Sequence, residues 1–306
     1  RNVEKKMEEK KHEAIKGNVD VKFIKNDKGY EIKVFNGMQY SIYMIFKVLK
    51  DKQSSIFIDE DTSKIRSLEP QLSEEEQLNQ DERYFERVVD PSPSKTYKEI
   101  IRLEWKPKQR YSFKYYFKYM YNPKNTKPKQ DVLYALPLNG TFLCAQSHNG
   151  KLSHFGNHAY CVDFKCDEGT PIYAMRDGVV AEYQDQYKEG KFDKSFYEKW
   201  NYIRIVHDDH TFTEYGHLKH KGVCVKLGQR VEARQQIGFS GNTGYSQGPH
   251  LHIALNSVSM IVNGLKFSDI KPSVESQYFE FENASHEGFV PSKGDQVTSW
   301  GSYKDA

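Results

Sequence analysis

The chain is built from short runs of alternating apolar and polar residues, and this period of two most constrains its fold. Such runs occur from Val19 to Tyr121 and again from Leu133 to Leu255, and Gly, Pro, Asn and Asp residues interrupt them. Alternating side chains lie on opposite faces of a β-strand, whereas a helix repeats every 3.6 residues. The interrupting residues are typical of turns. The sequence therefore predicts an all-β, antiparallel protein.

Changes in composition divide the chain into five parts. Residues 1–18 are charged and favour a helix or a tether. Residues 19–121 hold several short strands without a cluster of histidines or paired acids, which predicts a small Ig-like β-sandwich that serves as an accessory domain. The polar, Pro-containing residues 122–132 predict a linker. Residues 133–258 predict a second antiparallel β domain, and residues 259–306 a C-terminal extension.

Charge and hydropathy exclude two classes of partner. The net charge is only +3, with lysines scattered among acids, so we expect no nucleic-acid binding. No run approaches the ~18 apolar residues of a membrane span. No signal peptide is visible and the sequence begins at Arg1, so an export leader or anchor is expected to lie outside it.

The cysteines lack CxxC spacing, which favours buried thiols, or at most one or two disulfides, over a zinc cluster; they are Cys144, Cys161, Cys166 and Cys224.

Two histidines stand one residue apart in the stretch GNTGYSQGPHLHIAL. The glycines and Pro249 predict a loop that leads directly into a strand. On that strand His250 and His252 share a face, because residues i and i+2 point the same way. Two imidazoles on one face suit a metal site, or a metal ligand beside a proton carrier. A solvated strand face carrying two histidines is the alternative.

Nine of the eleven histidines lie between His148 and His252. Three blocks in this region, DFKCDEGTPIYAMRDGVV, NYIRIVHDDHTFTEYGHL and IGFSGNTGYSQGPHLHIAL, resemble the lysostaphin/LytM-type zinc metallopeptidases in order and spacing. The resemblance covers roughly Leu133 to Leu255. That family cleaves peptide bonds in bacterial cell-wall peptidoglycan. The resemblance implies a LytM-type peptidase domain over residues 133–258.

The same resemblance implies a zinc site held by a histidine, an aspartate and the second histidine of His-x-His. Asp163 and His252 occupy two of these positions. The common family pattern places the first ligand four residues before the aspartate, where this chain has Ala159. His154 is the predicted first ligand, because a loop can bring it round to the metal. His158 is the alternative, although on an extended strand it would face away from Asp163.

The resemblance also implies two catalytic histidines. His250 matches the position that accepts a proton from the metal-activated water, a role that suits an imidazole at neutral pH. His217 matches the position that donates a hydrogen bond to the tetrahedral intermediate. His207, His210 and His220 are expected to face solvent on charged turns.

These expectations combine into a functional hypothesis. The chain is predicted to be an exported, zinc-dependent endopeptidase that hydrolyses cross-link or stem peptides of peptidoglycan, in the periplasm or outside the cell. A non-hydrolytic LytM-like protein that binds or regulates the wall is the alternative. The N-terminal β domain could engage a regulatory partner. The aromatic insertion at residues 183–200 either walls the substrate groove or is an ordinary surface excursion.

Overall fold

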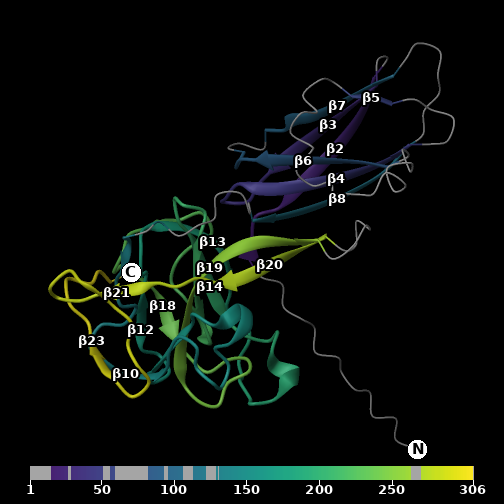
Figure 1. The fold of residues 1–306 in the computed structure, drawn as a ribbon. Coiled ribbons are helices and arrows are strands. Elements are labelled where there is room, and N and C mark those ends of the chain that lie inside the picture. Colours follow the sequence, from purple (N-terminus) through teal and green to yellow (C-terminus); the bar gives the residue numbers. More distant parts are fainter. Residues whose placement is uncertain are drawn as a thin grey trace, which may run out of the picture. The chain divides into compact units, whose positions relative to one another are not determined.

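The structure, a computed structural model, consists of two compact units that share one polypeptide in an interleaved order (Figure 1). Unit 1 comprises Arg1–Lys16, Pro128–Asn256 and Ser276–Ala306, and unit 2 comprises Gly17–Lys127 and Ser257–Glu275. No helix among the described residues is long and apolar enough to cross a membrane. The described residues are 15–26, 29–50, 56–58, 82–92, 96–105, 113–121, 129, 131–262 and 270–305.

The largest sheet forms the body of unit 1. Its strands are ordered β1-β13-β14-β15-β19-β11-β10-β23, with β17 paired to β13 and β20 paired to β19. The registers given along this order are antiparallel, as the sequence predicted. The strands are β1 (Ile15–Lys16), β10 (Thr141–Gln146), β11 (Val162–Lys165), β13 (Gly178–Gln184), β14 (Tyr202–Val206), β15 (Phe212–Gly216), β17 (Arg230–Val231), β19 (His250–Val262), β20 (Ile270–Ser276) and β23 (Gln296–Thr298).

Two three-stranded sheets and two short 3-10 helices complete the described part of unit 1. One sheet has the order β12-β18-β16 and the other the order β22-β21-β9, in which β9 and β21 run parallel. These elements are β9 (Leu133–Tyr134), β12 (Pro171–Tyr173), β16 (Leu218–Val223), β18 (Gln236–Ser240), β21 (Glu280–Glu282), β22 (Gly288–Phe289), η4 (Gly156–His158) and η5 (Lys194–Phe196).

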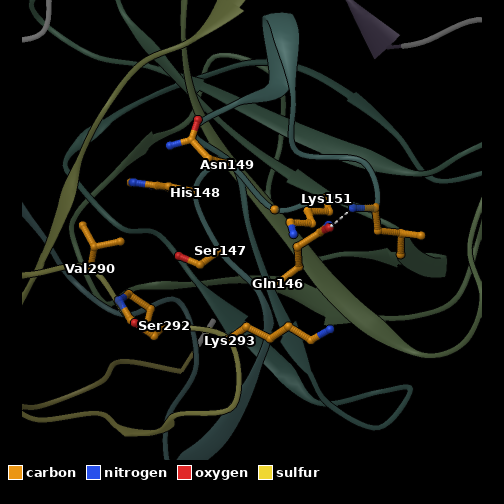
Figure 2. A pocket seen from close by; sticks show the side chains of 11 residues that line it. Gln146, Ser147, His148, Asn149, Lys151, Val290, Ser292 and Lys293 are labelled. Carbon is orange, nitrogen blue, oxygen red and sulfur yellow. Dashed lines mark hydrogen bonds between the residues drawn. The ribbon is translucent and has the colours of Figure 1, made fainter.

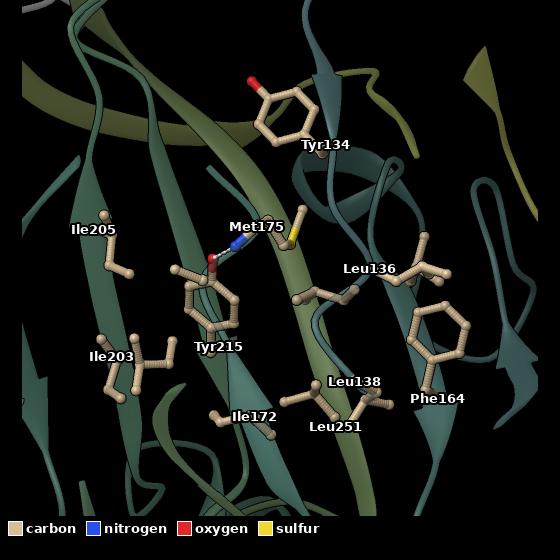
Figure 3. Packing of buried hydrophobic residues seen from close by; sticks show 14 of the residues in the cluster. Tyr134, Leu136, Leu138, Phe164, Ile172, Met175, Ile203, Ile205, Tyr215 and Leu251 are labelled. Atoms are coloured by element: carbon tan, nitrogen blue, oxygen red, sulfur yellow. Dashed lines mark hydrogen bonds between the residues drawn. The ribbon is translucent and has the colours of Figure 1, made fainter. Parts of the chain in front are cut away.

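The core of unit 1 follows from the alternation read in the sequence. On β19, Leu251 and Ile253 are fully buried in the hydrophobic cluster, and His250 and His252 alternate with them. Burial of aliphatic and aromatic side chains is the main favourable term in folding, at about 25 cal/mol per Å². Figure 3 shows this packing. The main-chain nitrogen of Met175 donates a hydrogen bond of 2.7 Å to the hydroxyl of the buried Tyr215.

Unit 2 contains two antiparallel sheets, of orders β2-β3-β7-β5 and β6-β4-β8. In β3, buried Ile32 and Val34 alternate with half-buried neighbours, so one face of the strand is covered. The Ig-like character of this unit stays a prediction. Its strands are β2 (Val19–Asn26), β3 (Gly29–Asn36), β4 (Ile42–Lys50), β5 (Ile56–Ile58), β6 (Glu82–Val89), β7 (Lys98–Trp105) and β8 (Phe113–Tyr121).

The boundaries in the structure differ from the predicted ones at two places. Ile15 and Lys16 do not continue a helix: they form β1, which pairs with β13 of unit 1. The rest of the predicted helix or tether, up to residue 14, lies outside the described residues. The predicted C-terminal extension divides between the units, since Ser257–Glu275 belongs to unit 2 and Ser276–Ala306 to unit 1. These assignments depend on contacts between distant segments, which local sequence patterns do not contain.

The four cysteines form no disulfide. Cys144, Cys161 and Cys166 are buried free thiols, and Cys224 is exposed. Burial raises the pKa of the Cys144 and Cys166 thiols to about 11, so both are neutral at physiological pH.

Candidate metal centre and active site

A row of direct cross-strand partners runs through the centre of the large sheet. Gln146 on β10 is opposite Asp163 on β11, Asp163 is opposite His252 on β19, and His252 is opposite Gly216 on β15. Directly opposite residues in antiparallel strands have Cβ atoms about 4.5–5.5 Å apart. The register therefore brings a carboxylate and an imidazole from segments 89 residues apart into contact.

Asp163 and His252 meet within hydrogen-bonding distance. The Nδ1 atom of His252 lies 2.8 Å from Oδ1 of Asp163. The carboxylate is almost completely buried, and the His252 side chain is largely so. Both residues were predicted as metal ligands, and the structure brings them together.

His154 reaches the same carboxylate from a loop. Its ring is fully buried, and its Nδ1 atom donates to the main-chain oxygen of Ser147 at 3.0 Å. Since a carbonyl can only accept, the proton sits on Nδ1 and the Nε2 lone pair is free. Nε2 lies 3.1 Å from Oδ2 of Asp163 and has no hydrogen-bond partner. A buried nitrogen with an unused lone pair, aimed at a carboxylate, is the arrangement that a metal ligand requires.

The three side chains together form a candidate metal centre. One ligand atom from each of His154, Asp163 and His252 lies within 4.8 Å of the others. Two imidazoles and one carboxylate are a donor set that suits a tetrahedral zinc ion with one open position. His158, the alternative first ligand, is exposed in η4 and does not join this group.

The charge states of these groups depend on one another. Burial alone would raise the pKa of the Asp163 carboxyl, but its contacts with His154 and His252 hold that pKa well below the usual range. Burial would lower the pKa of His252, but nearby Cys161 and Asp163 raise it well above the usual value. Ligands must be deprotonated to bind a metal, so a proton and a metal ion compete for this site.

The two predicted catalytic histidines lie together beside His252. The ring centroids of His217 and His250 are 4.5 Å apart, and those of His217 and His252 are 5.9 Å apart. His217 follows the end of β15 with a left-handed backbone, φ 59°. This conformation is uncommon for a residue with a Cβ atom and costs free energy, and such residues cluster at functional sites.

Main-chain oxygens fix the tautomer of both rings. Nδ1 of His217 donates to the Thr243 oxygen at 2.7 Å, and Nδ1 of His250 donates to the Gly248 oxygen at 2.8 Å. In the neutral rings, Nε2 therefore carries a lone pair and can accept a proton. Burial, followed by the neighbouring His250 and His252, lowers the pKa of His217 to about 3. The predicted role of His217 as a hydrogen-bond donor through Nε2 accordingly requires that the ring first be protonated.

The segment that orients these two rings is tied to the aromatic insertion. Main-chain hydrogen bonds join Gly244 to Glu189 and Lys191, at 3.0 and 2.9 Å. A Cβ atom at Gly190 would lie 1.9 Å from the oxygen of Asn242, so the two segments approach as closely as backbone allows. At its end the insertion places Trp200 against His217, with ring centroids 5.5 Å apart.

Three aromatic rings stack on the outside of this junction. Tyr245 packs between Phe192 and Tyr197 of the insertion, with centroid distances of 4.6 and 4.3 Å. Phe192 and Tyr197 are nevertheless 53% and 55% exposed. Exposed aromatic surface of this kind often marks a site of recognition. We call Phe192, Tyr197 and Tyr245 the aromatic stack.

Other histidines are placed differently from expectation. His207 does not face solvent: it is only 3% exposed, its Nδ1 donates to the Asp177 oxygen at 2.8 Å and its Nε2 lies 3.2 Å from the Thr213 hydroxyl. Burial lowers the pKa of His207 to about 4. His210 and His220 are half-buried. The prediction for His207 was wrong because the turn that carries it packs onto the sheet.

Sequence reasoning missed Gln146 and Trp200, both of which contact site residues. The Nε2 atom of Gln146 lies 3.1 Å from Oδ2 of Asp163. Trp200 also faces His252, with ring centroids 6.3 Å apart. The polar Gln146 at the end of an otherwise apolar strand, in TFLCAQ, was the available signal for the first.

A pocket of about 790 Å³ is lined in part by Gln146 (Figure 2). Its walls are formed by residues 146–152 and 290–293. His217, His250 and His252 do not line it, but Gln146, which contacts Asp163, does.

Comparison with known proteins agrees with this site. Residues 157–264 match peptidase family M23. Over these residues the chain is similar to the M23 metallopeptidases. The match includes Asp163, His217, His250 and His252, and it begins after His154.

Individual relatives are similar to part of the chain. The peptidoglycan DD-endopeptidase ShyA of Vibrio cholerae is 39% identical over 104 residues, which are 34% of this chain and 21% of that protein. The glycyl-glycine endopeptidase ALE-1 of Staphylococcus capitis is 42% identical over 98 residues, which are 32% of this chain and 24% of that protein. The catalytic domain of lysostaphin from Staphylococcus simulans matches over 44% of this chain and 87% of its own, with 26% identity and a TM-score of 0.27.

The chain spans between 20% and 24% of the length of these and other curated relatives it matches first. The family match at residues 157–264 leaves most of unit 2 outside it.

Proposed function

We propose that this chain is a zinc-dependent endopeptidase that hydrolyses peptide bonds in bacterial cell-wall peptidoglycan. The observation that carries the proposal is the convergence of His154, Asp163 and His252 beside the paired rings of His217 and His250. The match to a metallopeptidase family supports a metal cofactor, and two imidazoles with one carboxylate favour zinc. Relatives named as DD-endopeptidase and glycyl-glycine endopeptidase support the substrate class.

The residues divide the chemistry between them. His154, Asp163 and His252 would hold the metal ion, and Ser147 fixes the His154 ring by accepting its Nδ1 proton. A bound zinc ion would polarise the scissile carbonyl and lower the pKa of a water molecule. His250 accepts the proton of the attacking water at Nε2, because its Nδ1 proton is held by Gly248.

His217 completes the proposed machinery. Its Nε2 lone pair can take up a proton during the reaction, and the protonated ring can then donate to the developing oxyanion or to the leaving amine. Thr243 keeps the ring oriented throughout by accepting its Nδ1 proton. Trp200 packs against the same ring, with ring centroids 5.5 Å apart.

A cell-wall substrate implies that the protein acts outside the cytoplasm, in the periplasm or beyond. We also propose that the aromatic stack borders the substrate path, because the segment that carries Tyr245 also holds His217 and His250. Unit 2 is a candidate for binding a regulatory partner.

Digestion of purified peptidoglycan tests the proposal. The zinc-loaded protein should release peptides with new amino termini, a chelator should stop the release, and added zinc should restore it. Mass spectrometry of the products identifies the bond. A protein that binds one zinc ion but releases no peptides from any peptidoglycan would instead be a non-hydrolytic wall-binding or regulatory protein.

A further inference from the structure

Gln146 uses every hydrogen-bonding position of its side chain at the candidate metal centre. Its Nε2 atom donates to Oδ2 of Asp163 at 3.1 Å and to the Ser153 hydroxyl at 2.8 Å. Its Oε1 atom accepts from the main-chain nitrogens of Leu152 and Ser153 at 3.0 and 3.3 Å. The two backbone donors require an oxygen on that side, so the amide group that faces Asp163 must be the NH₂ group. Figure 2 shows the bond to the 150–153 loop.

The position of Gln146 in the sheet brings its side chain to Asp163. It is the cross-strand partner of Asp163, and the register between β10 and β11 shifts between Cys144 and Gln146. Such an irregularity re-aims a side chain relative to a regular strand. Gln146 is only 7% exposed, so a side-chain amide without hydrogen-bond partners would destabilise the folded protein here.

The backbone of Gly150 lies close against the side chain of Gln146. A Cβ atom at Gly150 would lie 2.4 Å from Cγ of Gln146, so only glycine leaves room for the amide side chain. Gly150 in turn accepts a hydrogen bond at 3.1 Å from the main-chain nitrogen of His154. The same side chain thus touches the aspartate and supports the loop that ends in His154.

We propose that Gln146 is a positioning residue for the metal centre: it orients the Asp163 carboxylate and fixes the 150–153 loop so that His154 and His252 approach opposite oxygens of that carboxylate. This inference rests on the proposed function for the presence of a metal ion. Hydrogen-bond partners of metal ligands typically contribute 10- to 100-fold to metal affinity. Gln146 makes no contact with substrate in this role.

The test measures zinc affinity directly, by competition with a chelator, on the full chain. Gln146→Met removes the four hydrogen bonds at nearly constant volume and should weaken zinc binding by about 10- to 100-fold. Gln184→Met is the matched control: Gln184 is also buried, and its Oε1 atom accepts from the main-chain nitrogens of Asp185 and Gln186 at 3.0 Å each, away from the centre. The control should bind zinc as the unaltered protein does.

Ser153→Ala separates the two contacts of the amide. It removes the hydroxyl acceptor but keeps the bond from Gln146 to Asp163, and zinc affinity should stay within about twofold of the original. Unfolding of the metal-free variants reports their stability independently of zinc. If Gln146→Met does not fold, Gly150→Ala takes its place, since its Cβ atom displaces the unaltered Gln146 side chain.

The inference is overturned if Gln146→Met binds zinc as tightly as the unaltered protein, or if Gln184→Met loses affinity to the same extent. Both results leave the proposed function intact. An unaltered protein that fails to bind zinc would overturn the proposed function together with this inference.

Discussion

Asp163 and His252 are direct partners across two antiparallel strands, and Nδ1 of His252 lies 2.8 Å from one carboxylate oxygen while Nε2 of His154 lies 3.1 Å from the other. The strand register fixes the first contact, and a loop supplies the second. For the ligand in the loop, the sequence offered two candidates, His154 and His158.

Replacement of the loop histidines distinguishes them. His154→Ala should lower zinc affinity by more than about 100-fold, because it removes a ligand rather than a partner of a ligand. His158→Ala should retain zinc, since His158 is exposed and outside the three-residue group. Metal content after dialysis measures both. Loss of zinc in His158→Ala with retention in His154→Ala would reverse the assignment.

The paired histidines should affect turnover without affecting metal content. His250→Ala and His217→Ala should each lower kcat by about 10²- to 10⁴-fold, the usual contribution of a positioned proton carrier. Both should keep one zinc ion per chain, because neither ring belongs to the metal group. Steady-state kinetics on a released peptide, with zinc analysis of the same samples, checks this. Zinc loss in either variant would place that ring among the ligands.

His207 should make stability depend on pH. Its pKa is about 4 in the folded protein and about 6.5 when unfolded, so the unfolded chain takes up a proton first as pH falls. The stability that His207 contributes is complete above pH 6.5 and is lost as pH falls towards 4, by on the order of 3 kcal/mol. The free energies of unfolding of the metal-free protein and of His207→Asn, measured with denaturant, should therefore approach each other as pH falls from 6.5 to 4. If the free energies of unfolding of the two proteins change with pH in parallel, the lowered pKa of His207 is contradicted.

The aromatic stack should affect substrate binding more than chemistry. Tyr197→Ala removes one face of the stack and should raise KM by about 3- to 10-fold with kcat nearly unchanged, as expected for an aromatic contact. Tyr278→Ala is the control, because this exposed tyrosine packs near His148 instead. An unchanged KM in Tyr197→Ala would leave the insertion as a surface excursion.

The sequence predicted the strands and the shared face of His250 and His252, because alternation on a strand is local. It also favoured His154 over His158 as the first ligand, but it could not exclude His158. The loop conformation depends on contacts with Ser147 and Gln146, which no periodic pattern in the sequence reveals. The sequence misplaced His207, whose partners become visible only when the turn packs against the sheet.

The interleaved order of the two units limits where the protein can be cut. A gene fragment that begins at residue 131 would encode His217 and His250, the proposed catalytic histidines. It would lack the edge strand at Ile15–Lys16 and would leave Ser257–Glu275 without most of the unit to which it belongs. Domain swaps and minimal enzymes made from this protein should therefore keep both termini and exchange internal segments.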